Sequence, residues 1–481
     1  MNKGIVLHYL SMALLLSSAL FVVPALVSLY YGEYYFLLIF LCVGAGMALA
    51  ALPGALYRPK RRYMFAREGM VIAALMWIIF SAVGALPFYL SGSIPHYVDA
   101  LFESISGFTT TGSSILTDVE ALPRGILFWR SFTHWIGGMG ILVFVLAIVP
   151  LSDDRSMHLM KAEAPGPVVS KLVPKIKSTA KILYGIYIVL TILEMIFLFV
   201  GGMPLFDSVN HALSTAGTGG FSIKNSSIAA YNSPYFEYVI TVFMLLFSIN
   251  FNMFYLLLVR DFKAVFKNEE LRYYLVIVGI STAVITANIV HLYPTLESAF
   301  RHAVFQVATI TSTTGFFTAN YEEWPELSKT ILVVLTMLGA CGGSTGGGIK
   351  VSRFIILLKL TLREIRHILH PRSVNIIKLE GQRVSDETIQ GTTGYFITYI
   401  MLLFGSFILV SIDNYDFTTS ITAVITTLGN VGPGLSLVGP VENFSLFSDF
   451  SKIVLSLDML FGRLEIFPMI MLFSPSIWRR A

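Results

Sequence analysis

Charged residues and cysteines are scarce in this 481-residue sequence, and each shortage excludes a class of protein. Asp, Glu, Lys and Arg make up 13% of the chain and hydrophobic residues 55%, which is typical of an integral membrane protein rather than a soluble enzyme. The net charge of +4 gives no indication of a nucleic-acid partner. The two cysteines, Cys42 and Cys341, lie in apolar segments, so neither a zinc cluster nor a disulfide is expected. The apolar segments also lack the His, Asp or Cys groupings of a membrane-embedded enzyme, so we expect no enzymatic activity.

Long hydrophobic runs are abundant, and ten of them can cross a bilayer, which takes about 20 residues each. They lie near residues 7–31, 34–56, 69–92, 125–151, 182–203, 235–259, 273–293, 329–362, 393–412 and 451–473. The first has no clear cleavage site, so we expect it to be retained as a span. With the N-terminus inside, 25 of the 33 Lys and Arg residues fall on the cytoplasmic side and six outside, which predicts two cytoplasmic termini.

Four of the outer loops share one pattern, a short amphipathic run followed by a Ser/Thr-rich stretch that ends at glycine. They read "DALFESISGFTTTGSS", "DSVNHALSTAGTGGFS", "HAVFQVATITSTTGFF" and "TSITAVITTLGNVGPG". The four align without a gap on Gly112, Gly220, Gly315 and Gly432, and the short runs open thirteen residues upstream at Asp99, Asp207, His302 and Thr419. The pattern predicts a unit of span, re-entrant loop and span that is used four times after two leading spans.

The re-entrant loops are suited to a cation. Each short helix places the partial negative charge of its dipole at its C-terminal end, and the glycines permit positive φ angles that let carbonyls point at an ion. Rings of backbone carbonyls replace the hydration shell in potassium filters. We therefore expect a potassium-binding selectivity filter, which we also expect to be short and to pass Rb⁺. The predicted filter residues are Thr110, Thr111, Gly112, Thr218, Gly219, Gly220, Thr313, Thr314, Gly315, Asn430, Val431 and Gly432.

A glycine-rich segment, "LGACGGSTGGGIK" at residues 338–350, interrupts the eighth span. Irregular backbone at membrane depth survives only against protein or a water-filled cavity, so we predict a loop that obstructs the pore and acts as a gate. A packing kink against a neighbouring helix is the alternative. The residues predicted to form the gate are Gly342, Gly343, Ser344, Thr345, Gly346, Gly347, Gly348, Lys350 and Arg463.

Two of these gate residues are cations at membrane depth, where a lipid-facing charge costs several kcal/mol. We expect Lys350 and Arg463 to lie below the filter as positive barriers that meet the loop or its carbonyls. Asp458 and Glu465 offer a second interpretation, in which they neutralise Arg463 in a structural pair.

Five further polar residues have expected roles around the filter. Glu103 and Gln306 hold matching positions in the first and third loops and are expected to brace the filter from behind. Asp99 and Asp207 are expected to cap their helices. His134 is interpreted as a hydrogen-bonded packing residue.

These motifs resemble those of the Trk/Ktr/HKT superfamily of potassium transporters, and the TrkH branch most closely. The resemblance covers nearly the whole chain and rests on "FTTTG", "GGFS", "TSTTGFF", "GGSTGGGIK" and "GRLEIFP". In that family one glycine per filter loop marks potassium preference, and here all four positions are glycine. The fourth loop departs from the others with Pro433 and Gly434 after its glycine, which leaves its outer geometry open.

The resemblance implies an all-α polytopic membrane protein that takes up potassium across the bacterial inner membrane. It implies a homodimer with one pore per protomer and a cytosolic RCK-type regulatory subunit similar to TrkA. A nucleotide such as ATP, ADP or NAD would act only through that subunit, and the chain itself needs no covalent cofactor. The alternative function is an H⁺- or Na⁺-coupled potassium symporter with alternating access, although four repeats in the same orientation argue against it.

The expected organisation is five consecutive parts. Residues 1–67 form two N-terminal helices, and 68–155, 156–265, 266–372 and 373–481 form pore repeats one to four, with the gate loop in the third.

Overall fold

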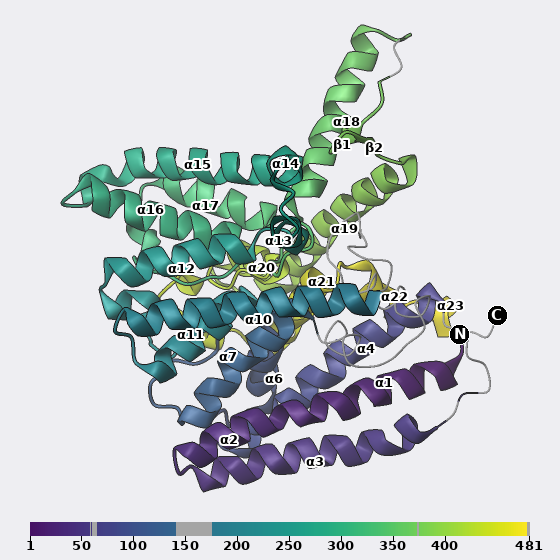
Figure 1. Cartoon of the computed structure of the whole chain (residues 1–481), viewed down its shortest axis with the longest axis vertical. Helices are drawn as coiled ribbons and strands as arrows, with labels where there is room; N and C mark the ends of the chain where they lie inside the picture. Colours follow the sequence, from purple (N-terminus) through teal and green to yellow (C-terminus); the bar gives the residue numbers. More distant parts are fainter. Residues whose placement is uncertain (58, 60–64, 141–175, 373–374, 479–481) are drawn as a thin grey trace.

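The computed structural model describes residues 1–57, 59, 65–140, 176–372 and 375–478, and these residues form a bundle of long helices (Figure 1). A two-residue antiparallel hairpin, β1 (Lys378–Leu379) with β2 (Gln382–Arg383), is the sheet structure within those ranges. The α-helices are α1 (Lys3–Ser17), α2 (Val22–Tyr30), α3 (Tyr34–Leu56), α4 (Ala66–Gly84), α5 (Leu86–Leu90), α6 (Tyr97–Phe108), α7 (Arg124–Met139), α10 (Ile176–Val200), α11 (Leu205–Gly217), α12 (Pro234–Phe247), α13 (Phe251–Leu258), α14 (Phe262–Lys267), α15 (Glu269–Ile289), α16 (Leu296–Thr311), α17 (Glu326–Leu338), α18 (Val351–Leu369), α19 (Asp386–Val410), α20 (Phe417–Gly429), α21 (Asp449–Arg463), α22 (Phe467–Leu472) and α23 (Pro475–Trp478).

Six helical segments of the described chain are long and apolar enough to cross a membrane, so the chain is a multi-pass membrane protein. They are Lys3–Tyr30, Tyr34–Leu56, Arg67–Leu90, Ala180–Val200, Glu269–Leu292 and Asp386–Asp413. Each lies on one of the ten predicted apolar segments. The other four predicted segments contain helices that stop before they would complete a crossing.

The interrupted helices occupy the same place in the second, third and fourth predicted repeats, directly after the pore loop. In the second repeat α12 and α13 meet at an angle of 92° across residues 248–250. In the third, residues 339–350 separate α17 from α18, and in the fourth, residues 464–466 separate α21 from α22. The predicted spans at 235–259 and 451–473 therefore each consist of two helices with a break between them, and the sequence analysis recognised only the break marked by consecutive glycines. The predicted span at 125–151 holds α7, and its part beyond Gly140 lies outside the described residues.

The leading helices α1 to α3 lie beside the first repeat and cover it (Figure 1). This cover explains a difference in burial between the spans. In the Arg67–Leu90 span 61% of the apolar window is buried, whereas the value is 28% for the Ala180–Val200, Glu269–Leu292 and Asp386–Asp413 spans. The apolar surface of those three spans faces outward, as expected for helices in contact with lipid.

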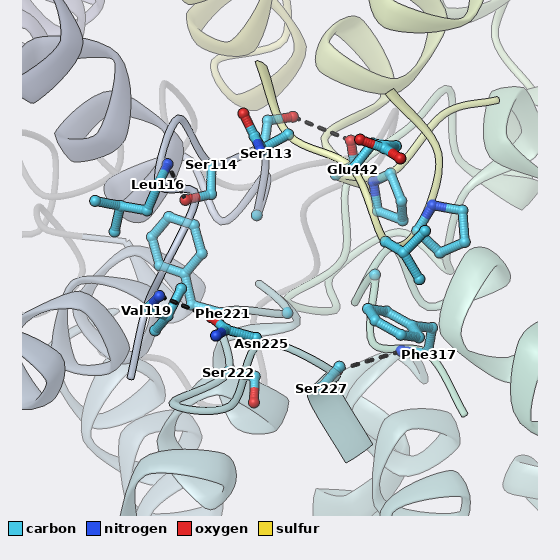
Figure 2. A pocket seen from close by; sticks show the side chains of 18 of the residues that line it. Ser113, Ser114, Leu116, Val119, Phe221, Ser222, Asn225, Ser227, Phe317 and Glu442 are labelled. Atoms are coloured by element: carbon cyan, nitrogen blue, oxygen red, sulfur yellow. Dashed lines mark hydrogen bonds between the residues drawn. The ribbon is translucent and has the colours of Figure 1, made fainter. Parts of the chain in front are cut away.

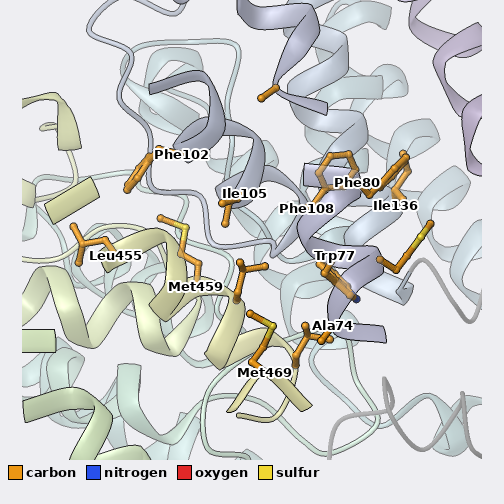
Figure 3. Close-up of a cluster of buried hydrophobic side chains, with 14 of the residues drawn as sticks. Ala74, Trp77, Phe80, Phe102, Ile105, Phe108, Ile136, Leu455, Met459 and Met469 are labelled. Atoms are coloured by element: carbon orange, nitrogen blue, oxygen red, sulfur yellow. The ribbon is translucent and has the colours of Figure 1, made fainter. Parts of the chain in front are cut away.

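The fourth repeat packs against the first through an apolar core (Figure 3). Leu455 and Met459 of α21 lie on the same side of this core as Phe102 and Ile105 of α6, and Met469 of α22 approaches Ala74 of α4. This packing brings together segments more than 300 residues apart in the chain. Bulky, fully buried side chains such as Trp77, Phe80 and Phe108 make the junction rigid.

The last described helix, α23, lies at the same end of the bundle as the start of α1 (Figure 1). This placement agrees with termini on one side of the membrane. Of the proposed repeat boundaries, 155/156 lies outside the described residues, and 265/266 falls within the short helix α14.

Candidate ion pathway

The four pore helices α6, α11, α16 and α20 end in the same backbone motif. In each loop the residue two before the aligned glycine has a left-handed conformation, with φ of 56° at Thr110, 55° at Thr218, 59° at Thr313 and 53° at Asn430. The amide of the following residue donates to the carbonyl five positions earlier, at 2.8–2.9 Å in all four loops. This is the Schellman arrangement that satisfies the last carbonyls of a helix. The same non-glycine strain in four places indicates one loop geometry used four times.

The aligned glycines, which we call the glycine ring (Gly112, Gly220, Gly315 and Gly432), also have positive φ, between 81° and 104°. Each lies against a backbone carbonyl of the next loop, so that an added Cβ would collide with that oxygen. A Cβ added to Gly112 would lie 2.1 Å from the Gly219 oxygen, and one added to Gly220 would lie 2.0 Å from the Thr314 oxygen. A Cβ added to Gly315 would lie 2.2 Å from the Val431 oxygen, and one added to Gly432 would lie 2.7 Å from the Thr111 oxygen. The contacts run from loop one to two, three, four and back to one, which closes the ring.

The glycine ring therefore brings together twelve residues that the sequence analysis grouped, three from each loop. It presents neutral carbonyl oxygens and no side-chain charge, a donor set that suits a partly dehydrated monovalent cation. The fourth loop differs from the others at the position two before its glycine. Asn430 replaces threonine there and donates to the Thr111 hydroxyl at 2.8 Å and to the Met459 carbonyl at 2.9 Å.

A cavity of about 150 Å³ adjoins the glycine ring on the side of the segments that follow each glycine, and all four ring glycines line it (Figure 2). Its wall comes from the segments that follow each glycine, including Ser113, Phe221, Phe317 and Pro433. We call it the outer cavity. It gives the ring an open approach from the side on which the pore helices begin.

An ion pair and a histidine support the first two loops from behind. Arg130 of α7 pairs with Glu103 of α6 at 2.8 Å, both side chains being buried, and its guanidinium also donates to the Ser222 carbonyl at 3.1 Å. The Glu103 carboxylate accepts from the Ser114 hydroxyl and the Ile115 amide at 3.0 Å. The pair thus ties the segments after Gly112 and Gly220 together, and Glu103 braces the loop as expected.

His134 occupies the space behind the second loop. Its Nδ1 donates to the Gly107 carbonyl at 2.8 Å, and its Nε2 accepts from the Phe221 amide at 3.2 Å, so the imidazole is neutral and fully bonded. This confirms His134 as a packing residue. Gln306, at the position of Glu103 in the third loop, contributes one 3.5 Å hydrogen bond to the Ala319 carbonyl.

The predicted caps were wrong. His96 and Pro204 occupy the N-cap positions of α6 and α11, and neither side chain caps its helix, because both helices start earlier than the sequence pattern indicated. Asp99 instead accepts from the Lys452 ammonium at 2.5 Å, and Asp207 accepts from the Tyr231 hydroxyl at 2.7 Å. The short helices have from 12 residues in α6 to 16 in α16.

The glycine-rich loop (residues 339–350) lies directly beneath the third and fourth pore loops. The Gly347 amide donates to the Thr313 hydroxyl at 2.7 Å. A Cβ on Gly347 would lie 2.6 Å from the Gly429 carbonyl, and one on Gly346 would lie 2.9 Å from the Ser312 carbonyl. Glycine is therefore required here for close approach to the ends of α16 and α20.

The break between α12 and α13 satisfies the backbone of the glycine-rich loop. The Cys341 amide donates to the Ser248 carbonyl at 3.1 Å, and the Phe251 amide donates to the Gly343 carbonyl at 3.0 Å. Two irregular segments in the bundle interior thus pair with each other, which replaces the water that neither could reach in lipid. No local signal predicted this break, because Ser248 and Asn250 are ordinary polar residues in an apolar run.

Two cations reach the glycine-rich loop. Lys350 donates its ammonium to the Gly346 carbonyl. Arg463, at the end of α21, donates to the Thr345 carbonyl at 2.7 Å and to the Gly138 carbonyl at 2.6 Å, which joins the loop to the C-terminal end of α7. Both cations meet loop carbonyls, as predicted.

The acids near Arg463 in the sequence also form polar contacts. Glu465 forms an ion pair with Arg353 of α18, whose guanidinium lies 3.9 Å from the Tyr395 ring, and Asp458 accepts from the Ser406 hydroxyl at 2.6 Å. Glu270 was missed by the sequence analysis, although it accepts from the Gly342 amide inside the loop at 2.8 Å and from the Ser352 amide just after the loop at 2.9 Å. An acidic residue at the first turn of a span was the available signal.

The sequence of the chain matches the family model described as TrkH, cation transport protein, over residues 41–480. The chain belongs to this TrkH family. Similar proteins include the Trk system potassium uptake protein TrkH of Salmonella typhimurium, 35% identical with 100% of both chains covered. The Trk system potassium uptake protein TrkG of Escherichia coli is 32% identical, with 99% of this chain and 98% of TrkG covered.

A solved structure gives the same result for the fold of this TrkH-family chain. The crystal structure of the potassium transporter TrkH from Vibrio parahaemolyticus superposes with a TM-score of 0.89 at 31% identity, and both chains are covered in full. The family and the all-α polytopic fold predicted from the sequence are confirmed. The family consists of cation transport proteins, which agrees with the prediction of a transporter rather than an enzyme.

Proposed function

We propose that this chain takes up potassium across the bacterial inner membrane through a channel-like pore, with the four loop ends as its selectivity filter. The closed glycine ring carries the proposal. Its carbonyls come from four equivalent loops, its glycines cannot carry side chains, and the outer cavity opens onto it. The Trk system potassium uptake proteins named above are similar over the whole chain, which supports potassium as the substrate.

The glycine-rich loop is proposed as the gate. It lies under the third and fourth loops, and Arg463 links it to α7 of the first repeat, so the contacts span the pathway below the filter. An opening movement would have to break the Arg463 bridge and the pairing with residues 248–251. Lys350 and Arg463 would oppose cation passage while the loop is in place, because both are basic side chains in contact with carbonyls of that loop.

The proposed organisation keeps two leading helices and four pore repeats, with both termini in the cytoplasm. We propose a homodimer with one pore per protomer and a cytosolic RCK-type regulatory subunit, through which a nucleotide would act. The C-terminal part of α18, a helix that projects from the bundle in Figure 1, supports an additional contact. Ile365, Ile368 and Leu369 are exposed there between basic residues.

The test is a reversal-potential measurement on the purified protein in proteoliposomes or planar bilayers with opposed KCl and NaCl gradients. A potential close to the potassium equilibrium value is expected for a passive, selective pore. A potential that shifts with an imposed pH or sodium gradient would instead favour the coupled symporter, and a potential indifferent to potassium would contradict the proposal.

A further inference from the structure

Three charged side chains line the outer cavity, and they differ in how they present their charge. Arg130 is 2% exposed and neutralised by Glu103, so it adds little to the field in the cavity. Glu442 is exposed on the side opposite Asn225 (Figure 2). The side chain of Lys224 is 35% exposed, which makes its ammonium the solvent-accessible cation among the lining residues.

The Lys224 ammonium is held at the rim of the cavity by the first outer loop. Its Nζ donates to the Glu120 carboxylate at 3.0 Å. Asn225 fixes the position of this pair, because it accepts from the Val119 amide at 2.7 Å, as Figure 2 shows, and donates to the Asp118 carboxylate at 2.9 Å. The backbone amide of Asn225 donates to Glu120 at 3.3 Å. We call this network the rim bridge (Asp118, Glu120, Lys224 and Asn225).

The rim bridge joins the loops of two different repeats above the glycine ring, whereas the third and fourth loops contribute no lysine to the cavity lining. A lysine side chain is long and flexible, so without the Glu120 contact its ammonium would move through the cavity. The position of the positive charge relative to the cation path therefore depends on Glu120.

A fixed positive charge near a pore mouth repels cations in proportion to their valence. In water, a unit positive charge lowers the concentration of a monovalent cation about 10 Å away about twofold. It lowers the concentration of a divalent cation at the same distance about fourfold. Salt weakens the effect over a Debye length of about 10 Å at 0.1 M.

We propose that Lys224 is a valence-selective residue, which restricts the access of divalent cations to the glycine ring. Glu120 sets the strength of this restriction, because it holds the ammonium at the rim and offsets part of its positive charge in water. The inference rests on the proposed cation pathway. It concerns the charge of the permeant or blocking ion and is separate from the choice between potassium and sodium.

The experiment measures potassium current in planar bilayers at low ionic strength, with MgCl₂ added to the compartment that faces the outer cavity. Lys224→Gln should lower the Mg²⁺ concentration for half block about fourfold and raise potassium current at low potassium about twofold. Lys224→Arg, which keeps the charge, should behave as the parent chain. Glu120→Gln should have the opposite effect, with weaker Mg²⁺ block and lower potassium current.

The opposite changes in Mg²⁺ block expected for Lys224→Gln and Glu120→Gln distinguish an effect of charge from a loss of loop structure. If the rim bridge served only to hold the two loops together, Lys224→Gln and Glu120→Gln would change the block in the same direction, and the inference would be wrong. The matched control is Lys329→Gln, because Lys329 pairs with Glu326 at 2.6 Å outside the cavity lining and should leave block unchanged. A parent chain without potassium current would overturn the proposed function and this inference with it, whereas normal current with unaltered block in Lys224→Gln would overturn the inference alone.

Discussion

Alanine substitution in the glycine ring tests whether the four loops form one coordinated structure. Each ring glycine has positive φ, which costs an alanine about 1–2 kcal/mol on its own. The added Cβ would also meet a backbone carbonyl, which cannot move aside as a flexible side chain can. The damage should therefore depend on the distance to that carbonyl.

The distances rank the four positions. Ordinary van der Waals contact begins at 3.4 Å, so the facing carbonyl must retreat by 1.4 Å for Gly220→Ala, where the separation is 2.0 Å, but by 0.7 Å for Gly432→Ala, where it is 2.7 Å. Carbonyl displacements of this size change the coordination of an ion in a filter. We expect the greatest loss of potassium over sodium selectivity for Gly220→Ala, similar losses for Gly112→Ala and Gly315→Ala, and the least for Gly432→Ala.

The assay is the potassium-to-sodium permeability ratio from reversal potentials, with thermal unfolding of the same variants in detergent. Gly92→Ala is the control, since Gly92 also has positive φ, 73°, but has open space around its Cβ position. It should lose about 1–2 kcal/mol of stability and no selectivity. A Gly432→Ala variant less selective than Gly220→Ala, or a Gly92→Ala variant as damaging as either, would refute the reasoning from ring geometry.

Three further outcomes are expected. Arg463→Gln should raise basal cation flux, because the bridge between the glycine-rich loop and α7 is lost. Arg463→Lys should restore the low basal flux only in part, since an ammonium cannot span the same carbonyls. Equal flux in the parent chain and both variants would argue against a gate. Glu103→Gln should lower thermal stability by about 3–5 kcal/mol and reduce selectivity, because Arg130 would keep a buried charge without its partner; calorimetry and reversal potentials would show whether it does. The hydrogen bond from the Lys224 ammonium holds the pKa of Glu120 below its ordinary value of 4.5. The rim bridge should therefore persist at pH values above 4.5 and be lost as the pH falls through the lowered pKa and Glu120 becomes protonated. Mg²⁺ block should weaken over that acid range in the parent chain and stay constant in Glu120→Gln.

Membrane class, the pore-loop repeat and the family could all be predicted from the sequence alone. Apolar run length is set by bilayer thickness, and the aligned glycines mark positions where a side chain does not fit. Both signals are local, and neither depends on which segments are neighbours in space. The prediction that Arg463 and Lys350 meet loop carbonyls came from the cost of a lipid-facing charge, which is also independent of the fold.

The tertiary structure decided which partners those residues have. Asp99 was expected to cap α6 and instead pairs with Lys452, 353 positions later in the chain. The break after α12 was missed because it is stabilised by the glycine-rich loop rather than by its own sequence. Packing against a distant segment can replace a local hydrogen bond at little cost, so caps and helix breaks follow from contacts that no sequence window contains.

The glycine ring combines both kinds of information. Four glycines at matching positions indicated four loops, but their order around a closed ring, and the unequal 2.0–2.7 Å approaches within it, arise only when the first and fourth repeats pack together. The sequence determined where side chains had to be absent, because steric exclusion is a property of each residue. The fold decided which carbonyls fill the spaces, because that depends on how four separate loops converge.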